Sequence, residues 1–247
     1  MTRIVVVNPN TTAAMTEGIA RAAAAAAGAG TQIEARTAAH GPASIEGYVD
    51  EAYAVPALLQ AIVDDRSTPD AYVIACFDDT GLDAARCLAD APVVGIGEAA
   101  FHVATLVAHR FGVVTTLARS VATIEHNLLR YGMASRCSGV RAADVPVLDL
   151  HVPGSDARER IGSQIEAALR DDGADGVVLG CAGMAGLAAE LSARYGVPVI
   201  DGVAAAVALA ESLARLGLRT SRLGPYAPPR DKPYAGRFGG IAPWRQR

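Results

Sequence analysis

Two cysteines, Cys76 and Cys181, are the residues of this sequence whose type and position best suit chemistry. Each follows an apolar run, YVIA before the first and VVLG before the second. A free thiol has a pKa of roughly 8.5, and a helix N-terminus close by lowers it. Two thiols on opposite sides of a flat carbanion can remove a proton from one face of a carbon and return one to the other. The pair predicts proton transfer at a carbon acid, with inversion of a stereocentre.

The two cysteine motifs belong to an internal duplication of the chain. Three stretches of the first half align with three of the second, and the alignment places Cys76 on Cys181. The aligned pairs are DAYVIACFDDTGLDAA (70–85) with DGVVLGCAGMAGLAAE (175–190), PVVGIGEAAFHVATLVA (92–108) with PVIDGVAAAVALAESLA (198–214), and RIVVVNPNTT (3–12) with RFGVVTTLAR (110–119). The sequence therefore predicts two copies of one structural unit.

Apolar runs of strand length alternate with segments that have the composition and spacing of helices. Runs that are apolar on both faces and separated by helices indicate parallel strands buried between helix layers. The predicted fold class is α/β, with two pseudo-symmetric domains that each contain a parallel sheet flanked by helices. The predicted strands are 4–7, 71–75, 93–96, 112–115, 176–179 and 197–200.

The predicted domain boundary lies near Glu98–Val103. The first domain would comprise residues 1–98 plus 208–247, and the second residues 99–207. Open parallel sheets bind ligands outside the carboxyl ends of their strands, and both cysteines follow a strand at that end. Two facing domains would thus place the thiols on opposite walls of one cleft. The Pro-, Gly- and Arg-rich tail is expected to wrap the surface or a subunit interface.

Donors for the developing negative charge are predicted next to each thiol. The backbone N–H groups of Phe77 and Asp78, and those of Ala182 and Gly183, are expected to start the helices after the cysteines and to hold an enolate oxygen. The Asp78 carboxylate, and that of the neighbouring Asp79, would oppose ionisation of the adjacent thiol if they face it.

Four polar residues at strand ends are predicted to form a rim that binds substrate amide groups. Asn8 and Asn10 end the first strand, and Thr115 and Thr116 end its repeat partner. The run that begins at Asn8 can also serve as a turn and an N-cap for the next helix. Both interpretations stay open from the sequence.

Other motifs are expected to have ordinary structural roles. Cys87 in a helix and Cys137 in a loop are predicted to pack as small apolar side chains. The run GIGEAA (95–100) matches a degenerate dinucleotide fingerprint, but no acidic residue ends the following strand, so no nucleotide is expected. No CxxC pair and no metal-type spacing of the histidines occurs, so no metal site is expected.

Composition narrows the class of partner. The 247 residues carry a formal net charge of -4, which argues against a nucleic-acid partner. No apolar stretch reaches the roughly 18 residues of a membrane helix. The N-terminus lacks the features of a signal peptide, and four reduced thiols are expected in the cytoplasm.

Taken together, the motifs resemble those of the hydantoin racemases in the aspartate/glutamate racemase superfamily, with the allantoin racemases as the nearest sister group. The resemblance implies racemisation at C5 of a 5-substituted hydantoin or related cyclic ureide, without a metal or organic cofactor, in a homo-oligomer. It also implies that Cys76 and Cys181 are the two catalytic cysteines. The matching stretches are NPNTT (8–12), PASIEG (42–47), DAYVIACFDDTGLDAAR (70–86), FGVVTTLARSVATIE (111–125), VVLGCAGM (177–184) and GVPVIDGVAAAV (196–207).

The sequence departs from the superfamily pattern beside both cysteines. Amino-acid racemases usually carry Asn-Thr or Thr there to grip a carboxylate, whereas Phe77-Asp78 and Ala182-Gly183 suit a neutral ring. Allantoin racemases tend to have Gly at the place of Asp78, which favours hydantoins. Thr80 replaces a common Pro of the hydantoin group and is expected to shape the loop.

Three other functions remain open. The first is racemisation of allantoin or, less expected, of aspartate or glutamate. The second is a non-catalytic ureide-binding protein, and the third is a single-thiol decarboxylase or isomerase. Retention of both cysteines argues against the last two.

Overall fold

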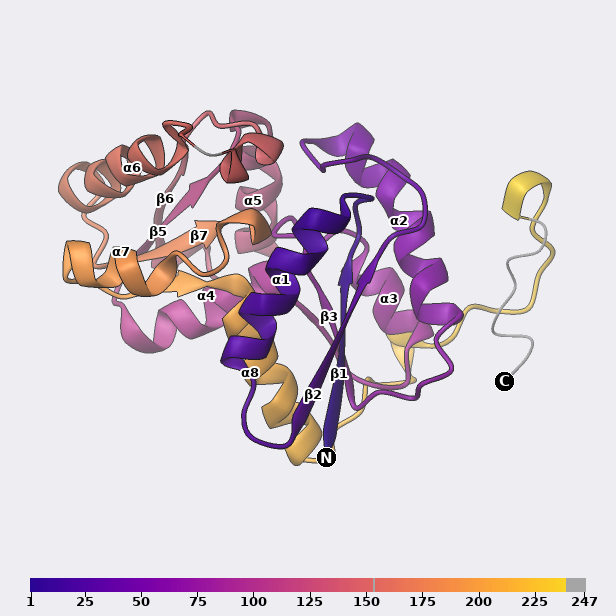
Figure 1. The fold of residues 1–247 in the computed structure, drawn as a ribbon. Coiled ribbons are helices and arrows are strands. Elements are labelled where there is room, and N and C mark those ends of the chain that lie inside the picture. The colour runs from indigo at the N-terminus through magenta and orange to yellow at the C-terminus, as the bar shows by residue number, and fades with distance from the viewer. Residues whose placement is uncertain (153, 239–247) are drawn as a thin grey trace.

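Two four-stranded parallel β-sheets, one in each half of the chain, form the framework of the protein (Figure 1). The computed structural model describes residues 1–152 and 154–238. The strand orders are β2-β1-β3-β4 and β6-β5-β7-β8, so both halves share one topology, and the predicted α/β class with a duplicated sheet is confirmed. The strands are β1 (Thr2–Asn8), β2 (Thr31–Thr37), β3 (Ala71–Ile74), β4 (Val93–Gly95), β5 (Phe111–Thr115), β6 (Cys137–Ala142), β7 (Gly176–Gly180) and β8 (Val199–Asp201).

Helices follow the strands and cover both faces of each sheet (Figure 1). No helix among residues 1–152 and 154–238 is long and apolar enough to cross a membrane. The α-helices are α1 (Ala13–Ala26), α2 (Tyr48–Val63), α3 (Leu82–Leu88), α4 (Ile96–Val107), α5 (Ala118–Arg130), α6 (Ala157–Asp171), α7 (Ala188–Tyr195) and α8 (Gly202–Arg215). Short 3-10 helices are η1 (Ala134–Arg136), η2 (Val147–His151), η3 (Ala182–Met184), η4 (Gly224–Tyr226) and η5 (Gly236–Phe238).

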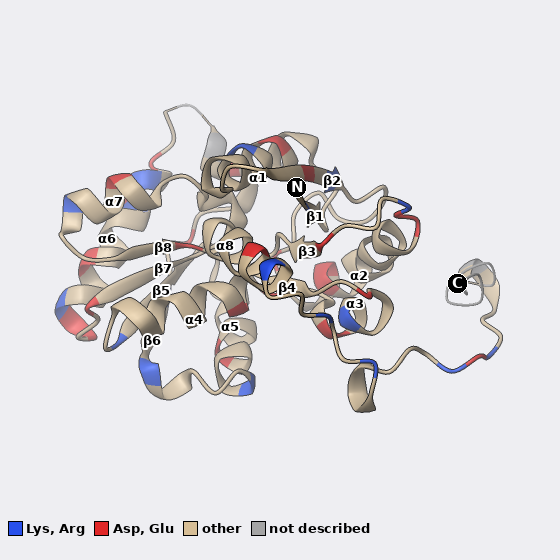
Figure 2. Ribbon diagram, turned by 90° about the horizontal axis from the view of Figure 1, so that it is seen from below, with Lys and Arg blue, Asp and Glu red and all other residues tan. Residues whose placement is uncertain are grey.

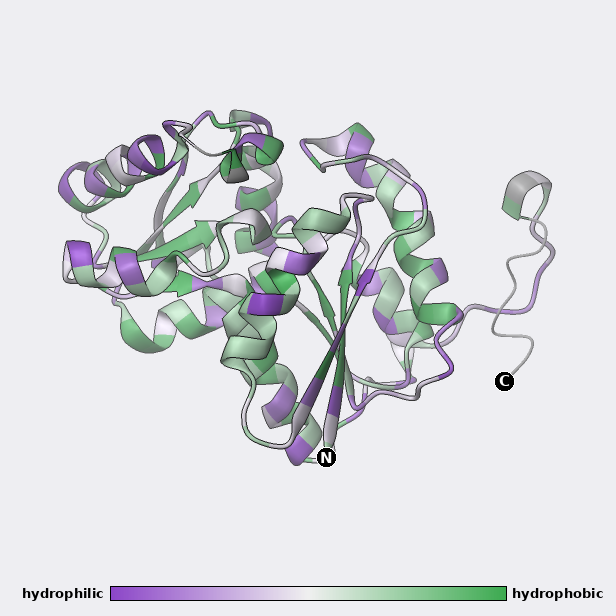
Figure 3. Cartoon of the chain, in the orientation of Figure 1, coloured by the Kyte–Doolittle hydropathy of each residue, from purple (hydrophilic) through white to green (hydrophobic). Residues whose placement is uncertain are grey.

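Strand β1 shows how the apolar interior is divided. Its residues Ile4 and Val6 belong to a core shared with α4, α8 and the second sheet, whereas Val5 and Val7 pack with α2 and α3 on the outer face. Burying each such side chain stabilises the fold by about 1.5–3 kcal/mol. In Figure 3, β7 is mostly green (hydrophobic), whereas β2 at the sheet edge carries purple (hydrophilic) stretches. The two sheets are therefore joined through one continuous core.

Helices α4 and α8 form the junction between the halves. Each contacts strands of both sheets, and α8 lies between the halves when the molecule is seen from below (Figure 2). The predicted boundary at Glu98–Val103 falls inside α4, which runs unbroken across it. Relative placement of the two sheets thus depends on two helices that are apolar on the sides facing them.

Equivalent hydrogen bonds set the position of the cysteine-bearing strands. Asp70 accepts the backbone N–H of Arg3 at 2.8 Å and donates its own N–H to the Arg3 carbonyl at 2.8 Å. Asp175 makes the same two bonds with Arg110, at 2.8 and 2.9 Å. These pairs set the register of β3 against β1 and of β7 against β5 in the same way. The carboxyl ends of β3 and β7 therefore occupy equivalent positions in their sheets.

The apolar runs predict six of the eight strands and miss β2 and β6. Both are edge strands, and their residues are mostly half-buried, which allows polar and charged side chains. The sequences TQIEART and CSGVRA therefore contain no apolar run. Cys137 begins β6, so the prediction that it lies in a loop is wrong. The other edge strands, β4 and β8, are mostly buried, and their apolar runs predict them.

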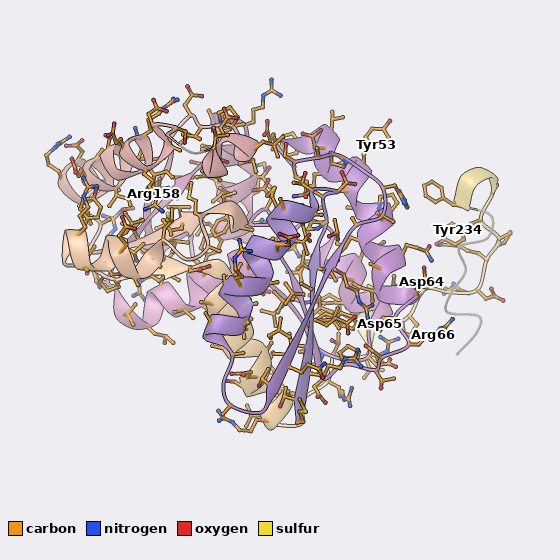
Figure 4. The ribbon with its side chains drawn as sticks, in the orientation of Figure 1. Tyr53, Asp64, Asp65, Arg66, Arg158 and Tyr234 are labelled. Atoms are coloured by element: carbon orange, nitrogen blue, oxygen red, sulfur yellow. The ribbon has the colours of Figure 1, made fainter. Side chains whose placement is uncertain are left out.

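The C-terminal tail packs on the first half where it leaves α8. The Thr220 hydroxyl donates to the Ala91 carbonyl at 3.1 Å, and the Tyr226 hydroxyl donates to the Asp83 carboxylate at 3.0 Å. Further along, Tyr234 lies on the tail away from the two sheets (Figure 4). The predicted first domain ends at residue 247, and its last residues, 239–247, lie outside the described part of the chain.

Candidate active site

Both cysteines line one cavity between the two halves. Cys76 follows β3 and Cys181 follows β7, and each thiol is partly buried. The cavity has a volume of about 30 Å³. The duplication predicts that the two thiols share a cleft, and the structure places them in it. The lining residues are Asn10, Met15, Ile45, Ala75, Cys76, Phe77, Asp78, Thr116, Ser120, Val147, Gly180, Cys181 and Ala182.

The chain turns in the same way after each cysteine. The Cys76 carbonyl accepts the N–H of Asp79 at 3.0 Å, and the Cys181 carbonyl accepts the N–H of Met184 at 3.0 Å. Ala182 starts the short helix η3, and the N–H of Gly183 donates to the Cys181 sulfur at 3.4 Å. The Gly183 N–H, which is predicted to hold an enolate oxygen, therefore donates to the Cys181 sulfur in this structure.

The prediction that Phe77 and Asp78 start a helix is wrong. Helix α3 begins only at Leu82, because Asp79 and Gly81 adopt φ values of +51° and +70°. A right-handed helix cannot pass through this left-handed region. The Phe77 ring instead packs edge-on against Phe101 in the shared core, with centroids 5.5 Å apart.

Thr80 contacts the first thiol directly. Its hydroxyl donates to the Cys76 sulfur across 3.2 Å, and its side chain is fully buried. Sequence reasoning expected this residue only to shape the loop. The structure adds a polar contact to the sulfur atom itself, from a residue four positions further along the chain.

Electrostatics at the thiols favour the protonated form. Burial raises the pKa of Cys181 to about 11, and it raises the pKa of Cys76 well above its usual value. The Asp78 carboxylate acts in the same direction on both thiols, as the sequence suggested for Cys76. The hydrogen bonds from Thr80 and Gly183 act in the opposite direction.

Asp78 is a buried carboxyl group in the cavity wall, with 7% of its surface exposed. The Ser120 hydroxyl reaches its carboxylate at 3.5 Å, and the Asn127 amide donates to its backbone carbonyl at 2.9 Å. Burial, with a smaller contribution from the carboxylates of Glu51 and Asp79, raises the pKa of Asp78 to about 7. Near neutral pH this group can donate a proton to a hydrogen bond or accept one.

The second carboxylate of the loop, Asp79, caps helix α4 and is no part of the cavity wall. It accepts the N–H groups of Gly97 and Glu98 at 3.0 and 2.8 Å and the Tyr131 hydroxyl at 2.8 Å. Burial raises the pKa of Asp79 to about 7 against these three donors. A Cβ atom on Gly97 would lie 2.8 Å from the carboxylate. The glycines of GIGEAA thus make room for Asp79, which occupies the end of α4 where a nucleotide phosphate would bind.

The two asparagines of the first strand end have different positions. Asn10 lines the cavity, whereas Asn8 is fully buried behind it. The Asn8 amide donates to the Asn10 side-chain oxygen and to the Thr16 hydroxyl, both at 2.9 Å. The Asn10 oxygen also accepts the N–H of Thr12 at 3.0 Å. Its amide nitrogen donates to the Met15 sulfur at 3.6 Å, and Met15 also lines the cavity.

The two threonines divide in the same manner. Thr116 lines the cavity, and Thr115 is fully buried. The Thr115 hydroxyl donates to the carbonyl of Gly180, the residue before Cys181, at 2.9 Å. In each half, therefore, one predicted rim residue reaches the cavity and the other supports the loop behind it.

Sequence reasoning missed several lining residues. Ser120 lines the cavity, and Asn127 supports it from behind through the Asp78 carbonyl. Both sit on the buried face of α5 beside Ile124, and polar residues at such positions are the available signal. Met15, Ile45 and Val147 form an apolar part of the wall. Ile45 comes from a loop and Val147 begins the short helix η2, so no periodicity marks either residue.

Cationic side chains are missing from the cavity wall as far as the described residues define it. In the same part of the chain, no three His, Cys, Asp or Glu side chains are grouped closely enough to hold a metal ion. Figure 4 places the charged residues Asp64, Asp65 and Arg66 beyond the C-terminal end of α2, far from the strand ends that carry the thiols. The chemistry available in the cavity is therefore that of thiols, amides, hydroxyls and one carboxyl group.

Known proteins resemble this chain over nearly its whole length. A family model described as Asp/Glu/hydantoin racemase matches residues 4–210. The hydantoin racemase of Rhizobium meliloti is 48% identical over 231 residues, which cover 93% of this chain and 96% of the relative. The solved allantoin racemase from Klebsiella pneumoniae is 48% identical with a TM-score of 0.94, over 97% of this chain and 98% of that one. The allantoin racemase from Pseudomonas fluorescens is 44% identical with a TM-score of 0.92, over 95% and 100%.

Proposed function

The chain belongs to the Asp/Glu/hydantoin racemase family, and we propose that it racemises 5-substituted hydantoins by moving the C5 proton between Cys76 and Cys181. One observation carries this proposal: two thiols from equivalent places in the duplicated fold line the same cavity. A binding protein needs no such pair, whereas a two-base racemisation needs one base on each face of the carbon.

The reaction balances with these two groups alone. One cysteine, as thiolate, takes the C5 proton, so that a C–H bond breaks and an S–H bond forms. The electron pair moves to the C4 carbonyl oxygen as an enolate. The other cysteine, as thiol, then gives its proton to the opposite face of C5. The roles of Cys76 and Cys181 exchange with the enantiomer.

The polar side chains of the wall are suited to hold the planar ureide. We assign the amide of Asn10, the hydroxyl of Thr116 and the carboxyl group of Asp78 to the ring carbonyl and N–H groups. Donors fixed before the reaction stabilise an enolate without further reorganisation. Asn8 and Thr115 act from behind by positioning their neighbours, and the backbones of Phe77, Ala182 and Gly183 shape the thiol loops.

We further propose that the cavity widens when the substrate enters. A volume of about 30 Å³ holds about two water molecules, since each needs roughly 10–15 Å³ on this scale. A five-membered ring with a substituent is larger. Ile45 from the first half and Val147 from the second both line the cavity, so movement between these two segments would open it.

Allantoin racemisation is the second candidate, because two solved allantoin racemases resemble this chain closely. Allantoin is itself a hydantoin with a ureido group at C5, so the proton transfer is the same. The apolar side chains of Met15, Ile45 and Val147 favour an apolar substituent over a ureido group. We therefore place hydantoins with apolar substituents first.

Free aspartate or glutamate fits this wall less well. Binding two carboxylates calls for cationic or multiple N–H donors, and no Lys, Arg or His belongs to the described cavity lining. Asp78 adds negative charge there when it is ionised. A neutral ring avoids this repulsion.

We further propose a homo-oligomer in the cytoplasm. Leu106 and Leu129 are 82% and 67% exposed in the single chain, which provides apolar surface for a second subunit. All four cysteines are free thiols, as suits a reducing compartment. Light scattering on the purified protein gives the number of subunits directly.

The test of function is a substrate panel in D₂O with reductant and EDTA. One enantiomer of 5-benzylhydantoin, one of allantoin, and L-aspartate are incubated separately, and we follow optical rotation and deuterium at C5 of the rings or at Cα of aspartate. We expect loss of rotation with deuterium at C5 for the hydantoin, a slower change for allantoin and none for aspartate. A folded protein with free thiols that changes none of them would contradict the proposal and would favour a binding role.

A further inference from the structure

The two thiols differ in one contact that the duplication makes visible. Thr80, which donates to the Cys76 sulfur at 3.2 Å, aligns with Ala185 in the second half. Ala185 has no hydroxyl group, and the Cys181 sulfur accepts the backbone N–H of Gly183 at the longer distance of 3.4 Å. A side-chain donor is thus present on one side of the pseudo-symmetric pair and has no counterpart on the other.

We propose that Thr80 is a catalytic residue that stabilises the thiolate of Cys76 by hydrogen bonding and so lets this cysteine act as a base. The inference rests on the proposed function, because it assigns a role within the same proton transfer. Thr80 keeps its own proton throughout. Its hydroxyl donates to the sulfur before the C5 proton arrives, and the bond weakens when the thiolate becomes a thiol.

Burial makes such a donor important. The Thr80 side chain is fully buried, so water does not compete for the sulfur from that side. Hydrogen bonds to ionised groups are stronger than those between neutral groups, and they weigh more where water is excluded. One hydrogen bond to a charged group corresponds to about a tenfold change in the ionised fraction, or one pH unit.

The charges around Cys76 make this help necessary. Asp78 on the same loop and Cys181 across the cavity both disfavour the Cys76 thiolate. Glu51 on α2 acts on Asp78 and helps to keep it protonated, and Glu46 acts on Cys181. Apart from backbone groups, Thr80 is the contact that favours ionisation of Cys76.

The experiment measures the ionisation of each thiol without substrate. Full-length protein is alkylated with iodoacetamide at a series of pH values, and the modified cysteines are located by peptide mass spectrometry. The midpoint for each cysteine follows the apparent ionisation of that thiol in the presence of the other, and it does not depend on how fast the reagent enters. The variants are Thr80→Val, which removes the hydroxyl at nearly constant shape, and Thr80→Ser, which keeps it.

We expect Thr80→Val to raise the Cys76 midpoint by about one pH unit while the Cys181 midpoint stays within about 0.3 units. Thr80→Ser should restore the original midpoint. Thr123→Val, the same change at a buried threonine on α5, serves as the control and should move neither. An unchanged Cys76 midpoint in folded Thr80→Val protein would overturn the inference.

The alkylation experiment tests the role of Thr80 separately from the proposed racemase function. Thiol ionisation needs no substrate, so it can succeed or fail whether or not hydantoins are racemised. In the racemisation assay, the low-pH limb of kcat/KM should shift upward in Thr80→Val. It should shift equally for both enantiomers, because an equilibrium constant of one forces their kcat/KM values to be equal.

Discussion

The backbone N–H of Val147 donates to the carboxylate of Glu46 at 3.2 Å, and this bond links the two halves beside the thiol cavity. The neighbouring Ile45, like Val147, lines the cavity. Gly41 and Gly47 flank the segment with φ values of +129° and +141°, which glycine adopts most readily. We expect the segment 42–46 to move about these glycines when the cavity opens.

Removing the charge of Glu46 should make the enzyme active at lower pH. The Glu46 carboxylate contributes to the raised pKa of Cys181, after burial and Asp78. Glu46→Gln keeps an acceptor for Val147 but removes the charge, so the low-pH limb of kcat/KM should fall by up to about one unit. Glu166→Gln, the same change at an exposed residue of α6, should leave the profile unchanged. A profile that does not move in Glu46→Gln would contradict this assignment.

Shortening Ile45 should change which C5 substituent is preferred. Ile45 is 8% exposed and lines the cavity, so Ile45→Ala enlarges the space beside the ring. We expect the ratio of kcat/KM for 5-benzylhydantoin to that for 5-methylhydantoin to rise about tenfold. Val49→Ala, at a 70% exposed position on α2, is the control. Equal ratios in the two variants would show that Ile45 does not contact the substituent.

Two glycine substitutions should have opposite effects on stability. A Cβ on Gly97 would clash with the Phe77 carbonyl and lie 2.8 Å from the Asp79 carboxylate, so Gly97→Ala should destabilise the fold by about 1–3 kcal/mol. Gly18 lies within α1, and its Cβ would meet only Arg21 at 3.9 Å. Gly18→Ala should stabilise by about 0.5–1 kcal/mol. Urea denaturation midpoints give both values, and a Gly97→Ala variant as stable as the original would disprove the packing argument.

The buried carboxyl group of Asp78 should cost stability as the pH rises. Burial raises its pKa from 3.8 to about 7, so the folded state keeps a proton that the unfolded state has lost between these values. Stability from this group is complete below pH 4 and declines until about pH 7. Asp78→Asn removes the ionisation, so its advantage in Tm should grow from pH 4.5 to 7 and then level off. A difference in Tm that stays constant with pH would mean that Asp78 titrates normally.

Much of the framework follows from the sequence because the duplicated strands are buried on both faces. Runs such as Gly176–Gly180 are apolar throughout, and this pattern is what a strand between two helix layers requires. The half-buried edge strands β2 and β6 have no such pattern. The predicted helix start after Cys76 is wrong, because tertiary hydrogen bonds that the local sequence does not reveal hold Asp79 in a left-handed conformation.

The candidate site was predictable only in part. Equivalence in the repeat singles out Cys76 and Cys181, and the structure brings them to one cavity. The repeat does not reveal that Asn10 faces the cavity while Asn8 supports it, since both are polar residues of one turn. Contacts such as Thr80 to sulfur and Ser120 to Asp78 arise only when loops and helices pack.

The most direct test of the two-thiol account is deuterium exchange in single-cysteine variants. Cys76→Ala and Cys181→Ala are incubated in D₂O with each pure enantiomer of 5-benzylhydantoin, beside an enzyme-free blank, and C5 deuterium and optical rotation are measured. The account predicts that racemisation falls at least about a hundredfold in both variants. It also predicts that each variant exchanges the C5 proton of one enantiomer with retention, and that the two variants select opposite enantiomers. Full racemisation by either variant, or exchange of the same enantiomer by both, would contradict it.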